Sequence, residues 1–233
     1  MIVKNTRDNF WMLNWLDVFM KGHKGFICGG CFKNIFNKEK VKDLDIFFNS
    51  SKDFDEAVEY FDQMTEGWSD GETVVSEEDA EYTFLYENDN VKAYVHKETK
   101  VRIELCNKIF GNAEEIISQF DFTITKFAYY KAEICDETGE DVTDFEKSEK
   151  DKLKTHIEYK VAFHDKFFEH LHMKRLVTDD KIPYPMSTFE RAFRYAKYGY
   201  FPCKETKMKI INSLRGLPER DVELSKNLYD GMD

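Results

Sequence analysis

The sequence predicts an α/β (α+β) protein in which a small mixed sheet with flanking helices is followed by a helical C-terminal domain. Up to about residue 136, apolar residues recur both at helical spacing and in the two-residue alternation of strands, and no proline interrupts them. Beyond that point a charged stretch leads into long helical patterns, and all four prolines follow residue 182. We therefore place a sheet domain at residues 1–136 and a helical domain at residues 137–233.

Each element follows from its own pattern. Apolar residues that return every three or four positions predict helices at residues 7–21, 31–36, 54–61, 113–120, 161–171, 187–200 and 206–214. Short apolar or alternating runs predict strands at residues 25–28, 43–48, 73–75, 82–85, 91–95, 101–105 and 122–125.

Composition limits the possible partners. The net charge of −11 argues against a surface covered in phosphate-binding groups, although it leaves room for a local basic groove. No apolar run approaches the roughly 20 residues that cross a bilayer, and the N-terminus lacks the pattern of a secretory signal. Five cysteines without framework spacing favour a reducing compartment. We expect a cytoplasmic protein with no membrane partner.

The chemistry is expected where a strand ends in Gly29-Gly30 and a later strand begins with Asp43 and Asp45. Alternate side chains of a strand share a face, so both carboxylates point the same way with Cα atoms about 6.6 Å apart. Two acids this close repel each other, and a divalent cation relieves the repulsion. The glycines allow backbone N–H groups to approach a triphosphate.

Magnesium fits this arrangement because it prefers oxygen ligands and keeps positions open for water and phosphate. Two Mg²⁺ ions would serve a phosphoryl-type displacement. Glu104 is the expected third ligand, since it lies between apolar neighbours in a strand pattern, with an exposed strand carboxylate as the alternative. Asp121 competes with Glu104 for this role, or holds a turn.

These motifs resemble the nucleotidyltransferase superfamily, and in particular the head domain of bacterial poly(A) polymerases and CCA-adding enzymes. The family shows Gly-Gly followed by Asp-x-Asp, as Gly29-Gly30 and residues 43–45 do here. Its Arg-Asp-Phe-Thr-Ile-Asn is similar to residues 120–125, Phe-Asp-Phe-Thr-Ile-Thr. Its helical Arg-Ala-x-Arg-Phe-Ala is similar to residues 191–196, Arg-Ala-Phe-Arg-Tyr-Ala.

The resemblance implies transfer of NMP from an NTP to an acceptor hydroxyl, with release of pyrophosphate. It implies catalytic and metal-binding roles for Asp43, Asp45 and Glu104. It also implies nucleotide contacts by Gly29, Gly30, Lys33, Asn34, Arg191 and Arg194. An RNA or tRNA 3′ end is the family's usual acceptor, and a protein side chain or a small molecule stays open.

The sequence also departs from the family pattern. An Arg-Asp pair becomes Lys33-Asn34, the arginine before Asp121 becomes Phe120, and an asparagine becomes Thr125. The Glu-Asp-x-x-Arg with which CCA-adding enzymes choose their bases is missing. The closer resemblance is to small stand-alone proteins of phages and bacteria. The rival function is therefore a degenerate head that binds nucleotide or a partner without turnover, such as a phage or toxin–antitoxin regulator.

For several single residues, more than one role stays open. Cys28 and Cys31 form a C-x-x-C pair that also suits zinc or redox chemistry, but no second pair accompanies it. Arg191 and Arg194 lie three apart on one helical face, where they would contact nucleotide or form ion pairs with nearby acids. Lys33 would bind phosphate as a point charge or lie solvated on its helix.

Overall fold

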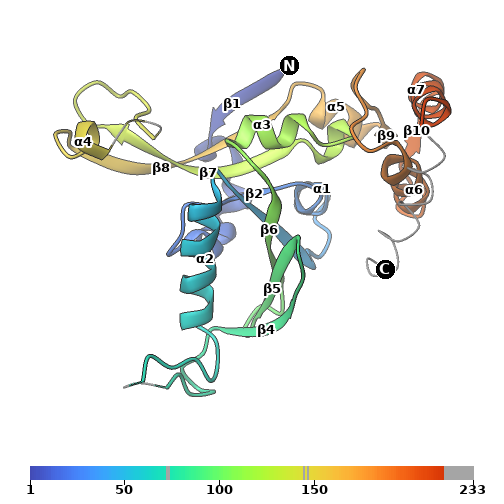
Figure 1. The fold of residues 1–233 in the computed structure, drawn as a ribbon. Coiled ribbons are helices and arrows are strands. Elements are labelled where there is room, and N and C mark those ends of the chain that lie inside the picture. The colour runs from blue at the N-terminus through green and yellow to red at the C-terminus, as the bar shows by residue number, and fades with distance from the viewer. Residues whose placement is uncertain (72–73, 144, 146, 218–233) are drawn as a thin grey trace.

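The computed structural model describes residues 1–71, 74–143, 145 and 147–217, and its main feature is one eight-stranded sheet (Figure 1). The strands of this sheet are β1 (Ile2–Thr6), β2 (Phe26–Cys28), β3 (Asp43–Phe48), β4 (Tyr82–Glu87), β5 (Val91–His96), β6 (Arg102–Phe110), β7 (Phe127–Cys135) and β8 (Thr155–His164). Their order is β1-β8-β7-β2-β3-β6-β5-β4. Strands β3 and β6 run parallel, and the other neighbours are antiparallel.

Helices cover both faces of the sheet. They are η1 (Arg7–Met20), α1 (Cys31–Phe36), α2 (Ser51–Gln63), α3 (Ala113–Ser118), η2 (Thr123–Thr125), α4 (Lys147–Lys150), α5 (Phe167–His172), α6 (Pro185–Ala196) and α7 (Lys204–Arg215). Two short strands, β9 (Arg175–Leu176) and β10 (Phe201–Pro202), form a separate parallel pair.

Two apolar clusters divide the core by sheet face. The larger one joins η1, α1 and α2 to alternate residues of the central strands, such as Leu44 and Ile46. The smaller one joins α3 to the opposite face, where Phe47 and Cys106 lie. Strand alternation therefore assigns the even-numbered residues of β3 to one face and the odd-numbered residues to the other.

Side-chain hydrogen bonds cap the N-termini of two helices. The Ser50 hydroxyl accepts a hydrogen bond from the Asp53 N–H at 3.2 Å, which begins α2. Asn112 and Glu115 form a reciprocal capping box at the start of α3. These caps fix helices that the apolar spacing had already predicted at residues 54–61 and 113–120.

The mixed α/β fold is confirmed, but the helix expected at residues 161–171 is found only in its second half, as α5. Residues up to His164 belong to β8, which lies between β1 and β7 and buries Val161, Ala162 and Phe163. A strand covered on both faces is apolar at successive positions, so its pattern mimics a helix. The β7–β8 pair carries the sheet past residue 136, so residues 137–233 are not wholly helical. The two long helices described in this part of the chain are α6 and α7.

Three smaller expectations also change. Residues 123–125 form the 3-10 turn η2 instead of a strand, and β7 follows it. The helix predicted at residues 7–21 is a 3-10 helix kinked at Phe10. The strand expected at 73–75 lies partly outside the described residues, and Val74 forms an isolated bridge with Ser69. None of the described helices combines the length and hydropathy of a membrane span.

Candidate active site

The glycine turn lies directly against the first predicted acid. Strand β2 ends at Cys28, and Gly29 then adopts φ +99°, which a residue with a side chain rarely tolerates. Its N–H donates to the Phe127 carbonyl at 3.0 Å, which holds the turn to β7. A Cβ added at Gly29 would lie 3.3 Å from Oδ2 of Asp45. The turn and the acid therefore face each other across the β2–β3 pair.

The three predicted acids share one face of two parallel strands. Asp45 lies opposite Glu104 in the β3–β6 register, and Asp43 lies opposite Arg102. Asp43 is exposed, Asp45 is partly buried, and the Glu104 side chain is 17% exposed. Glu104 also accepts a hydrogen bond from the Tyr86 hydroxyl at 3.1 Å. The register thus brings the three carboxylates to one end of the sheet.

Asp45 lies close to two other carboxylates and has a raised pKa. Burial, then the charges of Glu104 and Asp43, raise the pKa of Asp45 to about 7, while Arg191 opposes the shift. The side chains of Asp45 and Glu104 lie close enough for a hydrogen bond between them to add to this upward shift of the Asp45 pKa. A carboxyl that keeps its proton near neutral pH is a group whose charged form lacks a counter-ion. This is the electrostatic condition that a cation would relieve.

Arg102 supplies a positive charge in direct contact with two of the acids at this end of the sheet. Its guanidinium lies 3.3 Å from Oδ2 of Asp43, and its Nε lies 2.9 Å from Oε1 of Glu104. Sequence reasoning missed this residue, although alternation in Val101-Arg102-Ile103-Glu104 assigns Arg102 and Glu104 to one face. Arg102 therefore acts as an internal counter-ion between two of the predicted metal ligands.

The carboxylate oxygens of Asp43, Asp45 and Glu104 are of the type that Mg²⁺ binds, but their present arrangement does not form a metal site. Among the described residues, no three His, Cys, Asp or Glu side chains are gathered closely enough to hold a metal ion as they stand. Three carboxylates on paired strands still offer the oxygen ligands that Mg²⁺ prefers. Binding would require Asp43 and Glu104 to exchange the Arg102 guanidinium for the ion.

Helix α6 supplies a basic group to the same corner. Nε of Arg191 lies 3.4 Å from Oδ2 of the buried Asp121, and the Tyr195 hydroxyl is hydrogen-bonded to Arg191. Burial opposes the charge of Arg191, but Asp121, Tyr195 and Asp45 together raise its pKa. A Cβ at Gly30 would lie 3.4 Å from the Tyr195 hydroxyl, so α6 packs against the glycine turn.

The other predicted nucleotide contacts lie elsewhere. The buried Lys33 pairs with Glu39 at 3.0 Å and lies over the rings of Tyr198 and Tyr200. Asn34 donates to the Lys40 carbonyl at 3.2 Å. Arg194 is exposed on α6, and within the described part of the chain its side chain makes no ion pair. The structure thus brings together Gly29, Gly30, Asp43, Asp45, Glu104 and Arg191, whereas Lys33, Asn34 and Arg194 have other contacts or face solvent.

The C-x-x-C pair is buried beneath the site. Both Cys28 and Cys31 are free thiols, and burial raises the pKa of each well above its usual value. A buried thiol with a raised pKa is a poor nucleophile and a poor metal ligand. In this environment both cysteines act as small core residues.

The fold is that of the nucleotidyltransferases. A CCA-adding enzyme solved with ATP matches with a TM-score of 0.54 and 11% identity, over 92% of this chain and 46% of that one. A Thermotoga maritima CCA-adding enzyme complexed with tRNA gives 0.50 and 13%, over 90% and 45%. At these identities the similarity establishes the fold.

Sequence comparison then places the chain more closely. The profile described as Gabija anti-defense 2 family protein matches residues 5–174, and the chain belongs to this family. A relative named Gabija anti-defense 2, from Bacillus phage SPbetaL7, is 23% identical over 215 residues. That alignment covers 91% of this chain and 43% of the phage protein, so the chain spans less than half the length of this relative.

Proposed function

We propose that this protein is a magnesium-dependent nucleotidyltransferase that transfers NMP from an NTP to an acceptor hydroxyl, with an RNA 3′ end as the favoured acceptor, and releases pyrophosphate. One observation carries the proposal: Asp45 is paired with Glu104 across β3 and β6, and it faces the turn at Gly29. A glycine bend beside crowded carboxylates suits a triphosphate that arrives with cations.

Each residue of the site would have a role that follows from its position. Gly29 and Gly30 leave backbone N–H groups accessible to phosphate oxygens. Arg191, 34% exposed and close enough to Asp45 to influence its charge, would contact the nucleotide from α6. Asp43, Asp45 and Glu104 would hold two Mg²⁺ ions, which when bound would supply charge neutralisation and activation of the attacking hydroxyl. Most of the rate would come from positioning.

The family name and the phage relative support a role for this reaction in the counter-defence of a phage against its host. The CCA-adding enzymes solved with ATP and with tRNA support an NTP and an RNA as the two substrates. A protein acceptor and a small-molecule acceptor are separate arms of the test.

The test is incubation of the protein with Mg²⁺, each α-labelled NTP in turn, and one of three acceptor pools: total RNA, a protein extract, or a small-molecule extract of cells. We expect label in one acceptor class, and no label with Asp45→Asn. Glu158→Gln is the matched control, because it neutralises another partly exposed strand carboxylate, on β8 away from the site. Chelation of Mg²⁺ should abolish labelling by the parental chain.

The second candidate function is nucleotide binding without turnover. Two observations favour it: Arg102 already neutralises two of the acids, and Asn34 stands where the family has a carboxylate. In that case NTP would raise the melting temperature, but nothing would be labelled with any acceptor. That pair of results would overturn the proposed transfer.

A further inference from the structure

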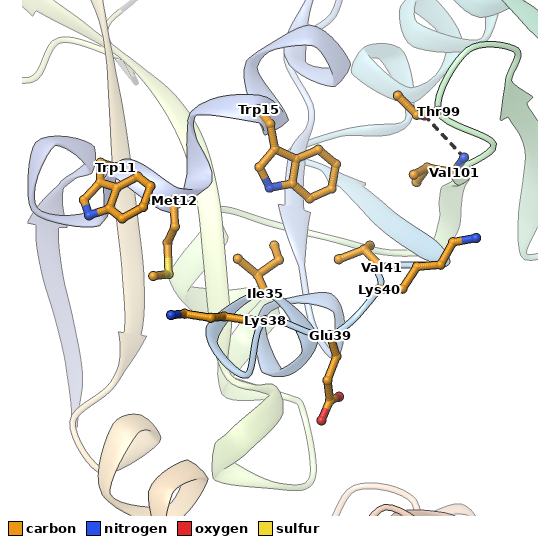
Figure 2. A pocket seen from close by; sticks show the side chains of 10 residues that line it. All are labelled: Trp11, Met12, Trp15, Ile35, Lys38, Glu39, Lys40, Val41, Thr99 and Val101. Carbon is orange, nitrogen blue, oxygen red and sulfur yellow. Dashed lines mark hydrogen bonds between the residues drawn. The ribbon is translucent and has the colours of Figure 1, made fainter.

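A groove on the face opposite the carboxylates joins exposed tryptophans to lysines. It has a volume of about 470 Å³, in the range of ligand-binding pockets. Figure 2 shows its lining: indole rings from η1 stand over the segment that follows α1, and the β5–β6 turn closes one end. The lining residues are Trp11, Met12, Trp15, Ile35, Lys38, Glu39, Lys40, Val41, Thr99 and Val101.

The two tryptophans offer flat apolar surfaces to solvent. Trp11 is 75% exposed and Trp15 is 38% exposed, although each belongs to a helix whose Leu13 and Leu16 are fully buried. Large aromatic side chains left this open on a helix with a well-packed inner face are available for stacking. Trp15 is held at an angle by an edge-on contact with Phe19, with ring centroids 5.8 Å apart.

The charge around the groove is positive, in contrast to the net charge of −11 for the whole chain. Residues 38–42 contain three exposed lysines and one glutamate, and Glu39 is already paired with Lys33. The turn at residues 97–100 adds two lysines against one glutamate. Within the described residues, Lys38, Lys40 and Lys42 have no ion pair with a carboxylate. Their ammonium groups are therefore available to an anionic partner.

Backbone conformation supports the same conclusion. The non-glycine residues with positive φ in the described chain are all lysines: Lys38, Lys100 and Lys174, at 59°, 57° and 53°. Left-handed positions usually take glycine or asparagine, because a side chain costs roughly 1 kcal/mol there. Two of these lysines adjoin the groove, where glycine would be less strained but would contribute no charge.

We propose that this groove binds single-stranded nucleic acid, with bases stacked on Trp11 and Trp15 and phosphates contacted by Lys38 and Lys40. Aromatic faces beside a basic track are the general means of holding a single strand, because every base can stack and every nucleotide carries a phosphate. A duplex hides its bases, so the groove favours unpaired strands. The proposal does not depend on nucleotidyl transfer.

The groove also lies at the end of the sheet that carries the carboxylates. Lys40 and Val41 lead into β3 at Asp43, and Val101 leads into β6 at Arg102. A strand that leaves the groove around this end of the sheet would reach the acids on the other face. If the proposed transfer is correct, the bound strand would be the acceptor.

The test is fluorescence anisotropy with labelled U12 and dT12 oligonucleotides and with a duplex of matched length, in EDTA so that the metal site plays no part. We expect the single strands to bind more tightly than the duplex. Trp11→Ala should weaken binding roughly tenfold, and Trp11→Phe should retain most of it. Each of Lys38→Ser and Lys40→Ser should reduce the slope of log K against log salt by about 0.7.

Matched controls separate the groove from general charge and from the carboxylate site. Lys52→Ser removes another exposed lysine, which lies on α2 beside Glu56, and should leave binding unchanged. Asp45→Asn should bind like the parental chain, so a failure of nucleotidyl transfer would not affect this result. Each variant must keep the parental melting temperature.

Three outcomes would overturn the proposal. The first is unchanged affinity of Trp11→Ala for the single strands. The second is an equal loss with Lys52→Ser, which would mean unspecific attraction. The third is no binding of either single-stranded oligonucleotide. If Trp11→Ala then also changed the oligomeric state, the groove would be a protein interface.

Discussion

At the scale of single residues, Arg102 decides how the acids are neutralised. It contacts both Asp43 and Glu104, so a bound cation has to displace it. We expect Arg102→Gln to melt at a lower temperature without metal, because the acids then repel each other. The same change should tighten Mn²⁺ binding roughly fivefold, the equivalent of about 1 kcal/mol for a partly exposed ion pair.

The measurement is Mn²⁺ titration by electron paramagnetic resonance without nucleotide, followed by melting with and without the ion. Lys52→Gln is the control for loss of one positive charge. Equal Mn²⁺ affinity in Arg102→Gln and the parental chain would show that the guanidinium does not compete with a metal.

Sequence alone placed the carboxylate pair correctly, since residue alternation and strand register decide which side chains share a face. It did not find Arg102 or Tyr195, and it assigned Lys33 to phosphate although the structure pairs it with Glu39. Tyr195 was missed because its partners come from distant parts of the chain, whereas alternation along β6 could have identified Arg102. The phosphate role of Lys33 stays a prediction.

At the scale of elements, His23 fixes the connection between η1 and β2. Its Nε2 lies 2.8 Å from the Phe19 carbonyl, and its Nδ1 accepts a hydrogen bond from the Gly25 N–H at 3.0 Å. Burial, aided by the charge of Lys131, lowers the pKa of His23 to about 4, despite the bond to Phe19. Protonation would place an unsolvated charge in the core and break the bond from Gly25.

This lowered pKa links folding to pH. The unfolded chain binds a proton on His23 below about pH 6.5, whereas the folded chain does so only near pH 4. The contribution of neutral His23 to stability is therefore complete above pH 6.5 and is lost as the pH falls toward 4. At pH 5 the loss should be about 2 kcal/mol.

Urea unfolding at pH 7 and pH 5 measures this loss. His23→Gln should show a smaller difference between the two pH values than the parental chain. The exposed His172→Gln should show the parental difference. If His23→Gln kept the full pH dependence, the effect would belong to other groups.

Element prediction from sequence succeeded for helices with one buried face and for the short apolar strands β2 and β3, and it failed at the longer strand β8. Helices α2 and α6 keep an apolar stripe, so their three- or four-residue spacing is visible. Strand β8 pairs on both sides and buries successive residues at its end, so its pattern resembles a helix. The error at β8 also led to the expectation of a wholly helical second domain.

At the scale of the whole molecule, the site depends on how α6 docks on the sheet. Phe122 and Tyr195 make an edge-on contact with centroids 5.7 Å apart, and Asp121 pairs with Arg191. These contacts connect a helix late in the chain to the turn at Gly30, which lies about 160 residues earlier. Arg191 can therefore stabilise the fold through its ion pair with Asp121, contact the nucleotide, or do both.

Paired variants distinguish these roles. Asp121→Asn and Arg191→Gln should each lower the free energy of unfolding by about 2 kcal/mol, because each leaves a charged partner without its ion pair. Only Arg191→Gln should also remove most of the melting-temperature increase that an NTP with Mg²⁺ produces, since only the guanidinium reaches toward Asp45. The exposed Arg194→Gln, on the same helix, is the control for charge. If both paired variants reduced the NTP effect equally, Arg191 would act through the docking of α6, and the nucleotide contact assigned to it would be wrong.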